Sequence, residues 1–198
     1  MGIMKKTKNR KLNRLKNYNY SNEGLYFVTI CIKNRHNLFG KIENNQMILN
    51  QYGKIIFQQW KWLFKRYEYV KQDEFVVMPN HVHGILIIIP GRDVIGRDVI
   101  GRDRSRPVPT NTNTNKNTNT NTNLRMQTNN LQKIKSLSEL IGAFKTTSSK
   151  KIHQIGMKNF QWQRSFHDRI IRDFDSLHNI RNYIQNNPKI WFRDRNNI

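Results

Sequence analysis

Two histidines at the start of a strongly apolar run are the feature that most constrains this chain. Residues 76–89 read Val-Val-Met-Pro-Asn-His-Val-His-Gly-Ile-Leu-Ile-Ile-Ile, with His81 and His83 on either side of Val82. Runs rich in β-branched residues favour strands, and side chains two positions apart on a strand point to the same face. We therefore expect both imidazoles to project from one face of a sheet and Val82 from the other. This pattern puts two metal-capable ligands on a rigid element.

The chain is strongly basic. Among its 198 residues, 35 Lys and Arg stand against 13 Asp and Glu, which gives a formal net charge of +22. An excess of this size indicates a polyanionic partner, most often nucleic acid. A membrane surface is the alternative, but no long amphipathic basic helix supports it, and Ile85–Ile89 is too short to span a bilayer. We expect no membrane partner.

Cysteine content and the N-terminal sequence indicate the cellular compartment in which the protein is expected. The single cysteine, Cys31, lies in an apolar run, so a disulfide framework within the chain is excluded and a buried thiol is expected. The basic N-terminus lacks the apolar segment of a secretory signal. Both features predict a reducing, cytoplasmic setting.

Composition divides the chain into three parts. Residues 1–22 are polar and basic, which predicts a flexible arm lying along phosphates. Residues 91–135 hold two copies of Gly-Arg-Asp-Val-Ile and an alternating Thr-Asn tract, so we expect a low-complexity, disordered insertion. Residues 23–90 and 136–192 are left to form a single catalytic domain. The arm residues expected to contact nucleic acid are Lys5, Lys6, Lys8, Arg10, Lys11 and Arg14.

Hydrophobic periodicity predicts an α+β fold. Strand patterns cover 25–32, 73–78, 82–90 and 162–171, with a short strand or turn near 46–49, and helical patterns cover 51–67, 136–155 and 175–187. Pro79 cannot donate to a ladder, so we place it in the bend between the second and third strands. The order βαββαβ is that of a ferredoxin-like antiparallel sheet. With both helices on one face, the open face can receive side chains from the extra C-terminal helix.

The second helix carries terminal signals of its own. Ser136 and Glu139 predict a capping box at its start, and Gly156 predicts its stop. Lys145, near its middle, and Arg164, after it, are expected to meet nucleic acid.

Candidate partners for the histidine pair lie in the last helix. Tyr183 and Asn187 are four residues apart and therefore stack on one helical face. Pro188 disfavours helical geometry at Asn187, which puts that amide at the helix end. An amide oxygen suits a hard divalent ion, and two imidazoles leave open positions for water or a phosphate oxygen. Tyr183, a packing residue when taken alone, needs a cation or a base beside it to act as a nucleophile.

Three further residues are accessory candidates. Asn80 immediately precedes the histidine pair. His167 and Asp168 adjoin in the fourth strand and alternate in direction, so only one of them can face the site. His167 has two readings, assistance in proton transfer and a structural role.

Taken in order, these motifs resemble the single-tyrosine, HUH-type transposases, especially the REP-associated tyrosine transposases; HUH stands for histidine, hydrophobe, histidine. The resemblance covers roughly residues 25–90 and 136–191. The segments that carry it are Met78-Pro79-Asn80-His81-Val82-His83-Gly84, then Phe144-Lys145, then Trp162-Gln163-Arg164-Ser165-Phe166-His167-Asp168, then Tyr183-Ile184 with Asn187-Pro188.

The resemblance implies an enzyme that cuts single-stranded DNA near REP-like hairpins, as a monomer or a homodimer. It implies that His81 and His83 bind the metal, Mg²⁺ or Mn²⁺, that Asn187 takes the place of a Gln or Asn ligand, and that Tyr183 is the nucleophile. The implied reaction is a transesterification in which the tyrosine stays joined to the 5′ side and a 3′-hydroxyl is released.

Two other classes of function stay open on the sequence. A non-catalytic, single-stranded nucleic-acid-binding module would explain the charge and the fold, but the base-stacking RNP pattern is not found. A metal-dependent nuclease that uses water would cut DNA without forming a protein–DNA adduct.

Overall fold

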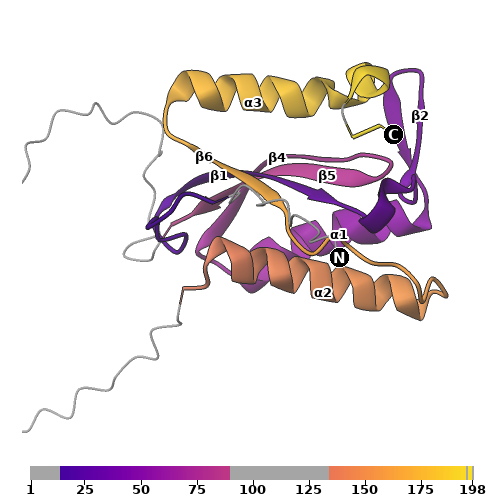
Figure 1. Cartoon of the computed structure of the whole chain (residues 1–198), viewed down its shortest axis with the longest axis horizontal. Coiled ribbons are helices and arrows are strands. Elements are labelled where there is room, and N and C mark those ends of the chain that lie inside the picture. The colour runs from indigo at the N-terminus through magenta and orange to yellow at the C-terminus, as the bar shows by residue number, and fades with distance from the viewer. Residues whose placement is uncertain (1–13, 90–133, 195, 198) are drawn as a thin grey trace, which may run out of the picture. The chain divides into compact units, whose positions relative to one another are not determined.

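The computed structural model describes residues 14–89, 134–194, 196 and 197 (Figure 1). Their elements are β1 Gly24–Cys31, η1 Lys33–Arg35, β2 Gly40–Glu43, β3 Gln46–Leu49, α1 Gln51–Arg66, β4 Val70–Val77, β5 His81–Ile88, α2 Leu137–Gln154, β6 His167–Ile171, α3 Phe174–Asn186 and η2 Asn187–Arg193, where η denotes a 3₁₀ helix. Most of the predicted basic arm and nearly all of the predicted insertion lie outside the described residues, so the domain boundaries stay predictions.

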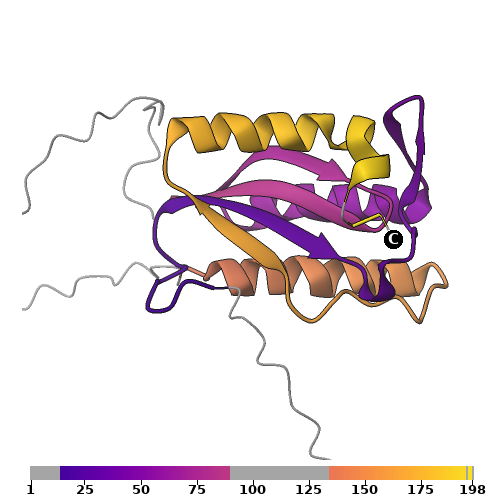
Figure 2. The same cartoon turned by 45° about the horizontal axis from the view of Figure 1, so that its top comes forward.

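The main sheet has four strands in the order β4-β5-β1-β6, and every neighbouring pair is antiparallel. With α1 between β1 and β4 and α2 between β5 and β6, this is the predicted ferredoxin-like arrangement. Helices α1 and α2 cover one face of the sheet, and α3 lies along the other (Figures 1 and 2). Of the helices in the described ranges, none combines the length and the hydropathy that crossing a membrane requires.

The larger core lies between the sheet and the pair α1 and α2. Its α1 side chains recur at the predicted helical spacing, with Ile56, Trp60 and Leu63 fully buried. Val82 packs into this core, as its alternation with the histidines predicts. A second, smaller cluster between the sheet and α3 includes Ile180 and other isoleucines. The sheet is therefore apolar on both faces, which is typical of central strands.

Gly84, directly after the histidine pair, permits a close approach between β5 and α1. A Cβ at this position would lie 2.5 Å from the indole of Trp60. That indole stacks on Phe75 of β4, with ring centroids 4.4 Å apart and planes 9° from parallel. The absent side chain lets the largest residue of the core lie flat against the strand that carries the histidines.

The helix ends follow their sequence signals. Asn50 accepts hydrogen bonds from the first-turn backbone N–H groups of α1. Ser136 and Glu139 form the predicted capping box of α2, and Gly156 follows its C-cap with φ +105°, so the predicted stop is confirmed.

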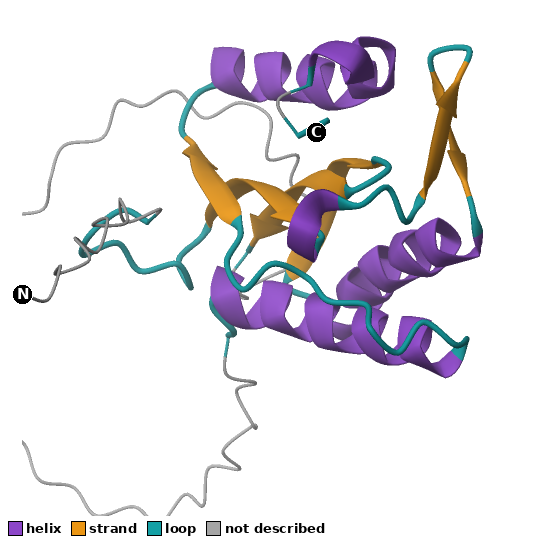
Figure 3. Cartoon of the chain, turned by 45° about the vertical axis from the view of Figure 1, so that its right-hand side comes forward, coloured by secondary structure: helices purple, strands orange, loops and turns teal. Residues whose placement is uncertain are grey.

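Three local predictions differ from the structure. The fourth strand begins at His167 rather than Trp162, which forms an isolated bridge with Ile32. The predicted strand near 46–49 pairs with an unpredicted one, β2, through an Asn-Asn turn with positive φ angles (Figure 3). Asn187 is helical, with φ −56° and ψ −42°, because Pro188 opens η2 at a position where its missing N–H is not needed.

Candidate active site

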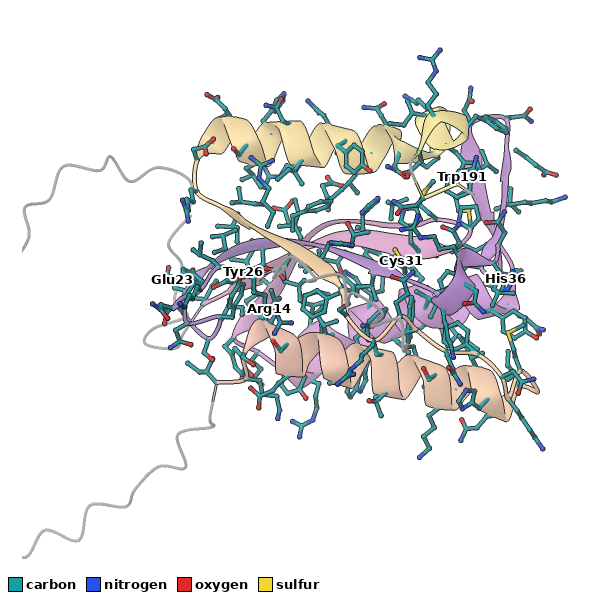
Figure 4. All side chains as sticks on the ribbon, viewed as in Figure 1. Arg14, Glu23, Tyr26, Cys31, His36 and Trp191 are labelled. Carbon is teal, nitrogen blue, oxygen red and sulfur yellow. The ribbon has the colours of Figure 1, made fainter. Side chains whose placement is uncertain are left out.

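The histidine pair lies at the start of β5, on the face of the sheet that α3 covers. The Nε2 atoms of His81 and His83 are 3.0 Å apart, and both rings are almost completely buried. In the β1–β5 register, Cys31 is opposite His81 and Thr29 is opposite His83. Trp191 of η2 closes the same side, with its ring centroid 6.0 Å from that of His81 (Figure 4). The expectation that both imidazoles share one face is confirmed.

Asn80 fixes the orientation and the tautomer of His81. Its Nδ2 donates to the backbone carbonyls of Arg35, at 3.0 Å, and Asn196, at 2.8 Å. These two acceptors determine which amide atom is the nitrogen, so the atom 2.8 Å from His81 Nδ1 is the oxygen Oδ1. His81 Nδ1–H therefore donates to Asn80, and Nε2 carries the lone pair. A backing hydrogen bond of this kind is typical of histidines that bind metals.

Thr29 holds the orientation of His83 but not its tautomer, and Tyr183 approaches the other side of the ring. The Thr29 hydroxyl is 2.8 Å from His83 Nδ1, and the Tyr183 hydroxyl is 3.2 Å from His83 Nε2. Phe27 stacks on the imidazole with centroids 5.4 Å apart. Because a hydroxyl both donates and accepts, Thr29 is compatible with either tautomer of His83.

Asp194 is a site residue that the sequence predictions missed. Its Oδ2 lies 3.9 Å from His81 Nε2, and its side chain is 2% exposed. One ligand atom from each of His81, His83 and Asp194 lies within 4.8 Å of the other two. No sequence signal marked it, because Pro188 predicts a helix end and Asp194 follows the 3₁₀ helix η2 that continues past this proline.

Asn187 is fully buried, and neither of its amide atoms has a hydrogen-bond partner among the described residues. It lies one α-helical turn after Tyr183, which meets His83. It also opens the 3₁₀ helix η2, whose Trp191 packs on His81. A buried amide left unpaired is rare and costs free energy, so it indicates a ligand that would satisfy it.

These donors fit a divalent cation. They comprise two imidazole nitrogens, a carboxylate oxygen with no hydrogen bond among the described residues, and the unpaired amide. Ligands ~90° apart around an octahedral ion at ~2.1 Å lie about 3.0 Å from each other. The two Nε2 atoms have that separation, 3.0 Å. The residues present therefore fit the metal that the sequence predicted.

A bulge in β4 docks α3 over the site. The β4–β5 pairing shifts register between Gln72 and Phe75, which frees the two acidic residues between them. Arg181 donates from Nε to Asp73 Oδ1 at 2.8 Å, and its terminal nitrogen also reaches the carboxylate. One turn later, Gln185 donates to Glu74 at 2.7 Å. These two contacts, the α3 anchor, fix both the rotation and the height of the helix that carries Tyr183.

His167 and Asp168, two of the accessory candidates, lie on opposite faces of the sheet, as alternation along a strand requires. His167 is opposite Thr29 in the β1–β6 register and lies on the site face, where it is exposed. Asp168 lies on the α2 face instead, 3.7 Å from the Arg14 guanidinium. Burial raises the pKa of Asp168, against the lowering effects of Tyr20 and Arg14. The structure does not bring Asp168 to the histidine pair.

Those predicted nucleic-acid contacts that the structure describes do not lie at the histidine pair either. Lys145 is half-buried, and its Nζ donates to the carbonyls of Gln163 and Ser165 at 2.9 and 3.1 Å. Burial lowers the pKa of Lys145 to about 8. Arg14 packs on the Phe166 ring on the α2 side of the sheet (Figure 4). Arg164 is exposed in the loop before β6. The other predicted arm residues, Lys5, Lys6, Lys8, Arg10 and Lys11, lie outside the described residues.

Comparison with known proteins extends these observations. No family model matches the chain. A Haemophilus influenzae protein, described as uncharacterized, is 37% identical over 186 residues, which span 92% of this chain and 89% of that protein. The chain belongs to the family of that protein. The match spans nearly the whole length of both proteins.

A solved structure, the REP-associated tyrosine transposase bound to a REP hairpin, has the same fold as this family member. It superposes with a TM-score of 0.51 over 90% of this chain and 73% of its own, at 16% sequence identity. The resemblance seen in the ordered motifs therefore extends to the arrangement of the sheet and the helices.

Proposed function

We propose that this protein is a metal-dependent enzyme that nicks single-stranded DNA and transfers the strand through a covalent tyrosine intermediate, as HUH-type transposases do. The observation that carries the proposal is the position of the Tyr183 hydroxyl, which lies 3.2 Å from His83 Nε2. This nitrogen is in turn 3.0 Å from His81 Nε2. The shared fold with a hairpin-bound transposase and the net charge of +22 support DNA as the substrate.

The chain's own residues supply the ligands for the metal. His81, His83 and Asp194 would hold Mg²⁺ or Mn²⁺, and the unpaired amide of Asn187 supports it as a further ligand. When bound, such an ion withdraws charge from the non-bridging oxygens of a phosphate and favours a neighbouring phenolate. Asn80 and Thr29 keep the two imidazoles directed at that position.

The reaction is a transesterification at phosphorus. The Tyr183 oxygen attacks the phosphate, a bond from that oxygen to phosphorus forms, and the bond from phosphorus to the 3′-oxygen breaks. The phenol gives up its proton, and the leaving 3′-oxygen takes one up to become a free hydroxyl. The DNA 5′ end stays on Tyr183 as a phosphodiester, so a second 3′-hydroxyl can displace it without a separate energy source.

The contact between Tyr183 and His83 of the same chain supports a site that is complete in one copy. The α3 anchor is also made within one chain, through Arg181 and Asp73. We therefore propose that a monomer is sufficient for cleavage, with the tyrosine acting in cis.

A labelled hairpin with single-stranded flanks tests the proposal. Incubation with Mn²⁺ should give a covalent band on a denaturing gel, lost in Tyr183→Phe and in His81→Ala. Tyr52→Phe on α1, half-buried on the other side of the sheet, is the matched control and should keep the adduct. Cutting by Tyr183→Phe without an adduct would instead identify a nuclease that uses water. Binding by the wild type without cutting would identify a binding module.

A further inference from the structure

Phe27, on the site face of β1, packs on both the tyrosine and the imidazole beside it. Its ring stacks on His83, with the planes 26° and the centroids 5.4 Å apart. It meets Tyr183 edge to face, with the planes 87° and the centroids 6.2 Å apart, which is a favoured arrangement of two rings. The centroids of Tyr183 and His83 are themselves 5.1 Å apart. Each of these rings therefore contacts the other two, and we call the set the ring triad.

The strand register explains how Phe27 reaches the imidazole. Phe27 and Thr29 are two positions apart on β1, so their side chains lie on the same face of the sheet. Thr29 is opposite His83 on β5, and Phe27 is opposite Ile85, the next residue on that face. Phe27 and His83 are thus diagonal neighbours on adjacent strands, a separation that an aromatic side chain can bridge. The ring that contacts both groups is therefore carried by the sheet itself rather than by a loop.

The α3 anchor fixes the backbone of Tyr183 but leaves its side chain free to rotate. Arg181 and Gln185, which make the anchor, lie on either side of Tyr183 in the helix. A long side chain in a helix has two common rotamers about its first torsion, and they direct its end to different places. A change of rotamer would carry the Tyr183 hydroxyl away from His83. A second restraint, acting on the side chain, is needed to keep the hydroxyl in place.

The hydrogen bond between Tyr183 and His83 does not supply that restraint during the reaction. It is made to His83 Nε2, the nitrogen that lies 3.0 Å from His81 Nε2 and faces the position proposed for the metal. A lone pair of His83 Nε2 that is directed at an ion can no longer accept from the phenol. The contact between Phe27 and the Tyr183 ring does not depend on that lone pair. It therefore persists in the state in which the phenol has to attack.

We propose that Phe27 is a positioning residue for strand transfer, whose ring holds the Tyr183 phenol in its attacking rotamer while His83 is bound to the metal. The inference rests on the proposed function. Asn80 and Thr29 act on the imidazoles, whereas Phe27 also acts on the nucleophile.

Two substitutions on one strand separate this role from a general effect on stability. Phe27→Leu and Leu25→Ala remove the same number of carbon atoms from half-buried side chains on the site face of β1, and both side chains pack against the same apolar cluster. Of the two, Phe27 is the one that contacts His83 and Tyr183. Both variants should therefore melt at a lower temperature than the wild type, and they are compared where both are folded.

The rate of adduct formation is measured in single turnover, with Mn²⁺ and a saturating amount of the labelled hairpin. Phe27→Leu should lower this rate roughly 10- to 100-fold, since a misplacement of about 1 Å can cost about 100-fold. Its affinity for the hairpin in EDTA and for Mn²⁺ in calorimetry should stay at the wild-type value, because the ring is a ligand of neither. Leu25→Ala should keep the wild-type rate.

Nuclear magnetic resonance gives a readout that needs no DNA. The ring signals of Tyr183 are identified by their loss in Tyr183→Phe. In saturating Mg²⁺, they should stay shifted from those of free tyrosine in the wild type and in Leu25→Ala. In Phe27→Leu they should move toward the free values, because the ring that held the phenol is gone.

An unchanged rate of adduct formation in Phe27→Leu would overturn the inference, and so would equal slowing in Leu25→Ala. Tyr183 signals that do not respond to Phe27→Leu would overturn it as well. Absence of any adduct from the wild type would be a different result, since it contradicts the proposed chemistry, while the signals of Tyr183 still test whether Phe27 holds the phenol.

Discussion

Removal of the Asn80 side chain should weaken metal binding and the fold together. In Asn80→Ala, the carbonyls of Arg35 and Asn196 lose a donor and His81 Nδ1–H loses its acceptor. A buried polar group left unpaired costs about 1–3 kcal/mol, and the Arg35 carbonyl is only partly buried. We expect a total loss of about 3–6 kcal/mol in the free energy of unfolding, which is roughly 6–24 °C in melting temperature.

The effect on the metal has a separate cause. Without Asn80, the His81 ring is no longer held with Nε2 directed at His83, and either ring nitrogen can carry the proton. Loss of such a backing hydrogen bond typically lowers metal affinity about 10- to 100-fold. Titration with Mn²⁺ by calorimetry, at a temperature where the variant is folded, measures this directly.

Asn50→Ala provides the control. Asn50 caps α1, where its side chain accepts from the N–H groups of Tyr52 and Gly53, far along the chain from the histidines. Its loss should cost about 1–2 kcal/mol of stability with no change in Mn²⁺ affinity. If Asn80→Ala binds Mn²⁺ as tightly as the wild type, or unfolds at the same urea concentration, then the amide does not hold His81 in the way described.

Three further predictions concern the core, the α3 anchor and the ligand set. Gly84→Ala should lower the free energy of unfolding in urea by about 1–3 kcal/mol, because its Cβ would lie 2.5 Å from Trp60. Gly142→Ala, whose Cβ would have nothing within 4 Å, should raise it by up to about 1 kcal/mol. Equal effects of the two substitutions would contradict the packing described. Burial, the largest single effect, would raise the pKa of Asp73, but the hydrogen bond from Arg181, the hydrogen bond from the Glu74 backbone and the charge of Arg181 together outweigh it and hold the pKa below its usual value. The pKa of Asp73 is thus lower in the folded state than in the unfolded state, where it is about 4. The Asp73–Arg181 pair therefore stabilises the fold at pH values above about 4, and this stabilisation is lost as the pH falls through the folded-state pKa of Asp73. Arg181→Met should therefore unfold more easily at pH 7, by about 1–3 kcal/mol, and differ less from the wild type below pH 4; a constant difference would be the contrary result. Asp194→Asn should lower the affinity for Mn²⁺ several-fold in calorimetry while keeping the fold, and unchanged affinity would remove Asp194 from the ligand set.

Much of the fold and half of the candidate site follow from spacing in the sequence. Side-chain direction along a strand depends only on position, so His81 and His83 could be placed on one face and Val82 on the other. Tyr183 could be placed with Asn187 on one helical face for the same reason. These are local relationships, and the structure keeps them.

The features that could not be predicted depend on tertiary context. Asp194 becomes a neighbour of His81 only because η2 continues past Pro188, where the sequence signals a helix end. The bulge at Asp73 has no local signature, since acidic residues are also common on exposed strands. Lys145 has the composition of a phosphate contact, but the loop carbonyls that it binds lie 18 to 20 residues away.

The α3 anchor has a consequence for how this protein can change over time. Two polar contacts one turn apart allow a single register, and a slip by one turn would carry the phenol ~5.4 Å along the axis, out of reach of His83. The residues that hold α3 on the sheet therefore also set the position of the Tyr183 hydroxyl beside His83. A lineage that drifted at Asp73 or Glu74 would therefore lose the contact between Tyr183 and His83 before it lost its fold.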